Sequence, residues 1–426
     1  MFDHSSATSK TSTSGTSPMR AWSLVFLASA VALPSLYLRV SGVHLAPEVT
    51  AVVCGVAILG AAFLLSWTLE VAQLHISASL AIAILALIAI LPEYAVEAVL
   101  AWDAGQAWRE GADPATIPEV GRVAANVTGA NRLLIGVGWS MVAVVFWIKR
   151  RRELVLPQNL SMEFTILTAA TLLTFLLFVF QEVTLYLSAI LIGLYIFYLW
   201  VSSRMPSHET HLIGPSEVIG KLPLKPQLIV TILLFLYSAF AILVSAEPFV
   251  EGLIETGTKF GISEFTLIQW LAPLASESPE LVIALLLTLR ANAIGGMTTL
   301  ISSGINQLTL LIGCMPIVFS LSFGEATGFP LDYQQSVEFF LTSSLSLFAV
   351  GLIARLKVPW YGAIALLGLF VAHLFFLGPE ARLIFSFIFL GLVAVLLIAD
   401  RGRILEMYRR AMTAFALYNG RKDYQM

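Results

Sequence analysis

Long apolar stretches alternate with short polar connections along almost the whole chain. Twelve of these stretches have the ~17–25 residues that a helix needs to cross a bilayer. The pattern therefore predicts an all-helical polytopic membrane protein with about twelve transmembrane helices. The stretches centre on residues 21–38, 48–67, 77–101, 123–148, 164–181, 183–202, 227–246, 265–289, 293–322, 336–354, 359–377 and 382–399.

The polar segments divide the chain into two halves. Residues 1–20 are rich in Ser and Thr and are predicted to form a disordered tail. Residues 203–226 form the longest polar connection near the middle and carry four prolines. Similar hydropathy on both sides of this connection is typical of a duplicated transporter. The predicted divisions are an extra helix and loop at 21–47, a first repeat at 48–202, a central cytoplasmic loop at 203–226, a second repeat at 227–380, and an extra helix with a cytoplasmic tail at 381–426.

Composition supports a membrane location. Hydrophobic residues make up 58% of the chain and charged residues only 12%, with a mean hydropathy of +0.87. An average soluble domain is about a quarter charged. This balance excludes an ordinary soluble enzyme, a disordered protein and a nucleic-acid-binding protein. The two cysteines, Cys54 and Cys314, lie inside apolar runs, so no disulfide framework is expected.

The distribution of positive charge predicts the orientation of the chain. With twelve crossings and a cytoplasmic N-terminus, 18 of the 24 Lys and Arg residues fall in the tails and connections on the cytoplasmic side. Positive charge is enriched on that side of membrane proteins. Both termini are therefore predicted to be cytoplasmic. The short central loop indicates a bacterial-type plasma (inner) membrane.

Away from the span ends, four acidic residues lie inside the predicted spans, where a charge is costly and indicates a function. The third span carries Glu93 and Glu97, and the eighth carries Glu277 and Glu280. Each pair lies three or four residues apart and so shares one helix face. Two carboxylates on one face repel each other unless a cation or proton lies between them. For Glu97 and Glu277 a solvated position near a membrane surface is the alternative, and Glu97 is a candidate vestibule residue.

A Pro-Glu pair stands near the middle of both acidic spans. Pro92 precedes Glu93, and Pro279 precedes Glu280. Because proline lacks an amide donor and clashes with the preceding turn, each helix is predicted to bend there. A bend frees backbone carbonyls beside a carboxylate, and hard cations such as Ca²⁺ or Na⁺ prefer oxygen ligands.

The span after each acidic span carries a matching polar segment. Gly129 to Asn131 in the fourth span and Gly304 to Asn306 in the ninth share the pattern Gly-x-Asn. Glycine permits a close helix approach, and the Asn carbonyl is a neutral oxygen ligand. Alone, such residues more often serve helix packing. Their position after a Pro-Glu span favours a functional role.

These paired motifs resemble those of the cation/Ca²⁺ exchanger superfamily, whose sodium/calcium exchanger members carry two inverted repeats. Each repeat there has a Gly-Thr-Ser-x-Pro-Glu stretch, followed on the next helix by Gly-Asn-x-x-Gly-Ser-Asn. Leu91-Pro92-Glu93 and Asn126 to Asn131 look like the first repeat, and Ser276 to Glu280 and Gly304 to Asn306 look like the second. The resemblance implies two inverted five-helix repeats with one extra helix at each end.

The chain departs from the family pattern at several positions. Ala89 and Ile90 stand where the Thr-Ser pair is expected, Glu277 replaces a Ser, and Ile301 replaces an Asn. Arg132 follows the last Asn of the first repeat. This arginine either faces the centre in place of a cation and pairs with Glu277 or Glu97, or it points away or packs at a helix interface.

The resemblance implies a secondary active antiporter that exchanges Ca²⁺ or another cation for Na⁺ or H⁺. Glu93 and Glu280 would face each other across the pseudo-twofold axis, and the first two helices would slide or rock against the core. The predicted cation ligands are Glu93, Glu280, Glu277, Asn126, Asn131, Asn306, Ser276 and Ser303, with Arg132 and Glu97 as possible charge modulators.

The alternatives are a Na⁺/H⁺-type antiporter, or a cation channel or non-transporting sensor on the same fold. An enzyme is not expected, because the chain has no HExxH motif, no Gly-x-Gly-Asp motif and no phosphate-binding glycine loop. No cofactor is expected. The expected partners are small inorganic cations and the lipid bilayer, without nucleic acid, and both a monomer and a homodimer remain possible.

Overall fold

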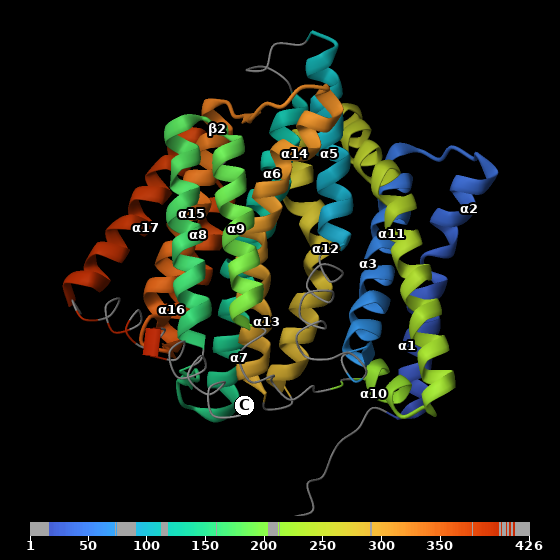
Figure 1. Cartoon of the computed structure of the whole chain (residues 1–426), viewed down its shortest axis with the longest axis horizontal. Coiled ribbons are helices and arrows are strands. Elements are labelled where there is room, and N and C mark those ends of the chain that lie inside the picture. The colour runs from blue at the N-terminus through green and yellow to red at the C-terminus, as the bar shows by residue number, and fades with distance from the viewer. Residues whose placement is uncertain are drawn as a thin grey trace, which may run out of the picture.

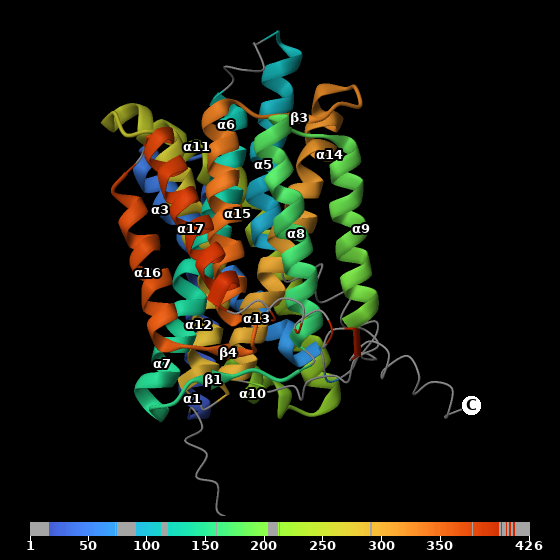
Figure 2. The same ribbon diagram turned by 90° about the vertical axis from the view of Figure 1, so that its left-hand side faces the viewer.

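The chain folds into helices that run roughly parallel to one another (Figures 1 and 2). The computed structural model describes residues 17–72, 74, 91–111, 118–158, 160–202, 212, 214–289, 292–376, 378–399 and a few positions between 402 and 413. Within these residues the helices of the first half are α1 (Pro18–Ala30), α2 (Leu33–Ser41), α3 (Pro47–Ala72), α5 (Leu91–Arg109), α6 (Pro118–Leu133), α7 (Ser140–Arg150), α8 (Leu160–Phe180) and α9 (Leu185–Ser202). Those of the second half are α10 (Pro215–Gly220), α11 (Leu224–Phe260), α12 (Glu264–Leu289), α13 (Ala293–Asn306), α14 (Ile312–Phe323), α15 (Tyr333–Ile353), α16 (Trp360–Leu374) and α17 (Pro379–Ala399).

The prediction of an all-helical polytopic membrane protein is confirmed. Among the described residues, nine helices are long and apolar enough to cross a membrane, and α12 makes a tenth as a bent pair. The apolar helix α16 is shorter, at 15 residues. The predicted span at 77–101 is covered from Leu91 onward, and its earlier residues lie outside the described ranges.

Several predicted boundaries were wrong. Helix α11 has 37 residues and ends at Phe260, far beyond the predicted end at 246. Its last turns carry Glu247, Glu251 and Glu255, which end the apolar run but continue the helix. At 1.5 Å per residue the helix spans roughly 55 Å, well over the ~30 Å of a hydrocarbon core. Helix α10 lies within the predicted central loop. Helix α1 already begins at Pro18, inside the predicted tail.

Four helices form a group at one side of the molecule, and we call α1, α2, α3 and α11 the four-helix group (Figure 1). Two small apolar clusters lie mainly within it. Buried residues of α3 and α11, such as Ile58 and Phe249, belong instead to the large cluster of the remaining bundle. Polar contacts also join its members. Lys259 pairs with Glu48 at 2.6 Å, and the hydroxyls of Ser35 and Ser245 lie 2.5 Å apart. These contacts join the four helices to one another, while α3 and α11 also pack against α5 and α12 of the remaining bundle.

Two short antiparallel ladders tie the two halves of the chain together. Strand β1 (Leu154–Val155) pairs with β4 (Lys357–Val358), and β2 (Glu182–Val183) pairs with β3 (Phe329–Pro330). The β1–β4 ladder lies at one end of the bundle and β3 at the other (Figure 2). The connections that were predicted on the same side of the membrane are thus paired at the same end of the molecule.

The two polar spans share an unusual helix geometry. The span Pro118–Arg150 contains a π-helical segment at Leu134–Trp139, and the span Ala293–Phe323 contains one at Gln307–Leu311. Each segment begins within a turn of the motif asparagine, Asn131 or Asn306. π-Helical turns are rare and occur often at functional sites.

Candidate functional site

Three of the predicted acids meet in the interior of the molecule. The carboxyl group of Glu93, in the first turn of α5, lies beside that of Glu277 on α12. Glu280 lies within electrostatic reach of Glu93. Glu93 is 5% exposed and Glu277 is fully buried. The two acidic spans, 187 residues apart in the sequence, therefore form one cluster.

A break in α12 separates two of these acids. The segments Glu264–Glu277 and Glu280–Leu289 meet at an angle of 52°. This bend agrees with the one predicted at Pro279, because a proline removes a helical hydrogen bond. The bend predicted at Pro92 cannot be compared, since the residues before Leu91 lie outside the described ranges.

Glu97 is buried, so its predicted alternative as a solvated surface acid is wrong. Its side chain is 3% exposed, one turn from Glu93 on α5. The Asn126 amide nitrogen donates a hydrogen bond of 3.1 Å to Glu97 Oε2. The predicted ligand Asn126 therefore contacts the acid that was assigned only a modulating role.

The two motif asparagines differ in their surroundings. Asn306 Oδ1 accepts a hydrogen bond of 3.4 Å from the Tyr94 hydroxyl, next to Glu93. Asn131 Oδ1 accepts one of 3.1 Å from Ser346 on α15. One asparagine thus lies at the acid cluster, and the other holds α6 against α15.

The predicted serines lie on the same two helices. Ser276 is buried beside Glu277, and its hydroxyl donates to the Ala272 carbonyl at 3.3 Å. Ser303 is half-buried on α13. Its neighbour Ser302 exchanges a hydrogen bond of 2.8 Å with Tyr198.

Gln307 was missed by the sequence analysis. Its buried amide lies beside the carboxyl groups of both Glu93 and Glu277. In the alignment of the two Gly-x-Asn motifs, Gln307 occupies the position of Arg132. That correspondence is the signal that could have identified it, because a polar residue follows the motif in both halves.

Arg132 does not pair with Glu277 or Glu97, so that predicted alternative was wrong. The guanidinium is fully buried and pairs with Glu338 of α15 at 2.7 Å. It also donates to the Thr128 carbonyl oxygen at 3.0 Å. Arg132 therefore packs at a helix interface, which was the other predicted alternative.

Arg132 belongs to a buried polar cluster that links four helices. Arg382 of α17 forms a second ion pair with Glu338. Gln269 of α12 donates to Glu338 at 3.1 Å and accepts from Arg382 at 3.2 Å. We call these four residues, Arg132, Glu338, Arg382 and Gln269, the arginine network. The sequence analysis singled out neither Glu338 nor Arg382, which lie near the ends of predicted spans and within helices α15 and α17.

The acid cluster has carboxyl oxygens that no described residue satisfies. Enclosed oxygens of Glu93, Glu97, Glu277 and Glu280 have no hydrogen-bond partner among the described residues. Buried carboxylates are strongly unfavourable unless a cation or a proton neutralises them. In this conformation no three His, Cys, Asp or Glu side chains of the described part of the chain converge closely enough to hold a metal ion. The acids therefore lie as neighbours and do not form a closed metal cage.

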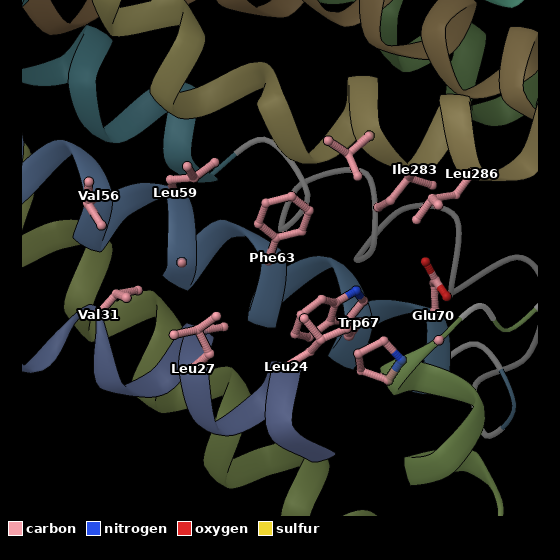
Figure 3. A pocket seen from close by; sticks show the side chains of 15 residues that line it. Leu24, Leu27, Val31, Val56, Leu59, Phe63, Trp67, Glu70, Ile283 and Leu286 are labelled. Atoms are coloured by element: carbon pink, nitrogen blue, oxygen red, sulfur yellow. The ribbon is translucent and has the colours of Figure 1, made fainter. Parts of the chain in front are cut away.

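An apolar cavity of about 440 Å³ lies apart from these acids (Figure 3). It separates α1 and α3 from the later part of α12, and Leu27, Phe63, Trp67 and Ile283 contribute to its wall. None of the predicted ligands lines it. Glu70 is the one charged residue in its lining, and a single carboxylate among apolar side chains does not make a cation site.

Comparisons with known proteins agree with this architecture. The family model described as "sodium/calcium exchanger protein" matches residues 48–204 and 230–378. A comparison with curated protein sequences gives no match.

Solved structures give clear matches. The chain is similar to the H⁺/Ca²⁺ exchanger CAX, with 37% identity and a TM-score of 0.87 over 94% of this chain and 100% of that one. It is also similar to YfkE, with 16% identity and a TM-score of 0.59 over 86% of this chain and 99% of that one. The sodium-calcium exchanger NCX_Mj matches with 17% identity and a TM-score of 0.52 over 78% of this chain and 97% of that one.

The similarity to YfkE and NCX_Mj concerns the fold alone. The family model and the similarity to CAX identify the family. The predicted resemblance is confirmed, and so is the expectation of a cation transporter that is not an enzyme. The chain is a multi-pass integral membrane protein and belongs to the sodium/calcium exchanger protein family.

Proposed function

We propose that this transporter exchanges Ca²⁺ for H⁺ at a central site built around Glu93, Glu277 and Glu280. The observation that carries the proposal is the meeting of these carboxyl groups, from spans in opposite halves, inside the molecule. A divalent cation or protons can neutralise them, but not both at once. Competition for the same oxygens couples the two fluxes without another energy source.

The choice of ions rests on two observations. Carboxyl and amide oxygens are the ligands that Ca²⁺ prefers. The similar protein CAX, 37% identical over most of this chain, is described as an H⁺/Ca²⁺ exchanger. Na⁺ is the second candidate counter-ion, because the matching family is described as sodium/calcium exchangers and the neutral amides of Gln307 and Asn306 suit a monovalent ion.

We further propose that Gln307, Asn306 and Ser276 supply neutral oxygens beside the acids, and that Asn126 acts through its hydrogen bond to Glu97. Asn131 and Ser303 stay predicted ligands. The hydrogen bond between Asn131 and Ser346 favours a packing role for Asn131.

Alternating access is assigned to the four-helix group, which has apolar clusters of its own. The sequence prediction named only the first two helices, and the packing of α3 against α11 adds the latter. We propose repeats at 48–202 and 227–380, with both termini at the cytoplasmic face of a plasma (inner) membrane. The concentration of Lys and Arg in the connections on that side supports this orientation.

Counterflow in proteoliposomes tests the proposal. An outward-directed proton gradient without Na⁺ should drive saturable ⁴⁵Ca²⁺ uptake, and Glu93→Gln and Glu280→Gln should each abolish it. Each substitution removes an ionisable group but keeps the size of the side chain. Uptake that requires a Na⁺ gradient would support Na⁺ as the counter-ion. Flux that does not depend on the gradient of any counter-ion would indicate a channel.

Glu110→Gln is the matched control, because Glu110 is an exposed acid just beyond the end of α5. Its flux should equal that of the unmodified protein. If both Glu93→Gln and Glu280→Gln transport at the wild-type rate, with normal size-exclusion profiles, the acid cluster is not the transport site.

A further inference from the structure

Glu163 is a further acid inside the bundle, outside both the acid cluster and the arginine network. Glu163 is in the first turn of α8, close in sequence to β1 and therefore near the β1–β4 end of the bundle. Its Oε2 atom is buried and has no hydrogen-bond partner within the described residues. The exchange site proposed above does not use it.

Two tyrosines of α9 have these acidic regions among their neighbours. Tyr195 and Tyr198 lie three residues apart on α9 and so share a helix face. They are 4% and 7% exposed, and their ring centroids are 6.0 Å apart. On this mainly apolar helix, the two buried tyrosine hydroxyls need polar neighbours.

The neighbours of these tyrosines connect the two acidic regions. Tyr198 lies within electrostatic reach of Glu163, and its hydroxyl shares a 2.8 Å hydrogen bond with Ser302. Tyr195 lies within electrostatic reach of Glu93. Glu163, Tyr198, Tyr195 and Glu93 therefore follow one another from the β1–β4 end of the bundle to its centre.

The titratable and charged groups near Glu163 come from several elements. From α9 the titratable group facing it is Tyr198, and the described helix α13 has no charged residue. On α15 the buried acid is Glu338, which is held by the arginine network. Beyond α15, Arg355 and Lys357 are exposed.

We propose that Glu163, Tyr198 and Tyr195 form a proton relay between the β1–β4 end of the molecule and the central carboxyls. This inference rests on the proposed H⁺/Ca²⁺ exchange. Glu163 gives its proton to the Tyr198 oxygen as the Tyr198 hydroxyl proton passes on to Tyr195, and the Tyr195 proton passes to the Glu93 carboxylate. Water bridges each gap longer than a hydrogen bond. One proton moves in total, each tyrosine stays neutral, and no electron is transferred.

The relay separates the paths of the two ions. In the alternating-access proposal above, the cation enters along the boundary between the four-helix group and the core. Helices α5 and α12, which carry the acids, lie between that group and the helices α8 and α9 (Figure 1). A proton can therefore reach Glu93 without passing through the opening that the cation uses. A purely structural role for Glu163, as an acid at the positive end of the α8 dipole, predicts no such effect on proton coupling.

Two fluxes measured on the same proteoliposomes separate these roles. Glu163→Gln and Tyr198→Phe should lower proton-driven ⁴⁵Ca²⁺ uptake roughly tenfold or more, as expected when a proton-transfer group is removed. Ca²⁺/⁴⁵Ca²⁺ self-exchange at equal pH, which moves no net proton, should be unchanged. Glu163→Asp should recover part of the proton-driven rate.

Matched controls are Glu153→Gln, an exposed acid beside β1, and Tyr186→Phe, an exposed tyrosine on α9. Both should transport normally. Equal loss of both fluxes in Tyr198→Phe, or a normal proton-driven rate in Glu163→Gln and Tyr198→Phe, would overturn the relay. Absence of proton-driven uptake in the unmodified protein would instead overturn the proposed counter-ion, so the two failures are distinguishable.

Discussion

Gly129 and Gly304 occupy the same motif position but meet different neighbours. A Cβ atom at Gly129 would overlap the backbone carbonyl oxygen of Gln269, so α6 and α12 can approach only because Gly129 has no side chain. At Gly304 the nearest atom to such a Cβ is a Leu167 methyl at 3.9 Å, an ordinary contact. The predicted packing role therefore holds for Gly129 alone.

Gly129→Ala should destabilise the protein by about 1–3 kcal/mol or more, the cost of overpacking against rigid backbone. Gly304→Ala, its matched control, should be tolerated. Thermal unfolding in detergent, followed by size-exclusion chromatography, measures both. Equal melting temperatures would contradict the close approach of α6 and α12.

The sequence identifies site residues that are ionisable, but not those that are neutral amides. Glu93 and Glu277 stand out because a charge inside an apolar run is costly. Gln307 does not, since an amide within a span is ordinary. The partner of Arg132 could not be predicted either, because Glu338 lies near a span end and only the packing of α6 against α15 brings the two together.

At the scale of elements, the arginine network joins an added helix to the two halves. Glu338 lies between Arg132 and Arg382, and so connects α15 with α6 and with α17. Its charge leaves the network one positive charge in excess. When one partner of a buried ion pair is removed, the remaining charged groups stay buried without a counter-charge, which destabilises the protein.

Glu338→Gln should therefore cost about 3–5 kcal/mol of stability, because it leaves two guanidinium groups without a buried carboxylate. Glu217→Gln breaks the largely exposed pair with Lys221 and should cost about 0–1 kcal/mol. Denaturation in detergent compares the two. A small effect of Glu338→Gln would show that the network does not hold α17 in place.

At the scale of the whole molecule, the four-helix group and the remaining bundle differ in their attachments. Contacts within the group are close, as in the pair Ser35 and Ser245. Across its boundary near the β2–β3 end, Asp103 of α5 and Glu247 of α11 lie within electrostatic reach of each other. Sliding of the group would change the distance between Asp103 and Glu247 and would leave the distance between Ser35 and Ser245 unchanged.

Cross-linking tests this motion in a background without Cys54 and Cys314. A bridge between Ser35→Cys and Ser245→Cys should leave transport intact, because both residues move together. A short bridge between Asp103→Cys and Glu247→Cys should block transport, with recovery on reduction. Full activity of the second bridged form would contradict sliding at this boundary.

The all-helical membrane architecture, the two matching halves and the pairing of two acidic spans follow from hydropathy and motif spacing. The membership of α11 in the four-helix group does not. It depends on which faces of apolar helices pack together, and uniformly apolar helices carry no stripe that marks a face. The same uniformity left the end of α11 undefined, because charged turns can continue a helix beyond the bilayer.

The two ladders also have a consequence for the order of synthesis. About 200 residues separate Leu154 from its partner Val358. At ~5–20 residues per second, the ribosome needs roughly 10–40 s to deliver β4 after β1. The first half must therefore persist in the membrane with its loops unpaired until the second half arrives. Ribosome pausing or early termination after residue 202 would leave a fragment with neither ladder, because β3 and β4 both lie in the second half.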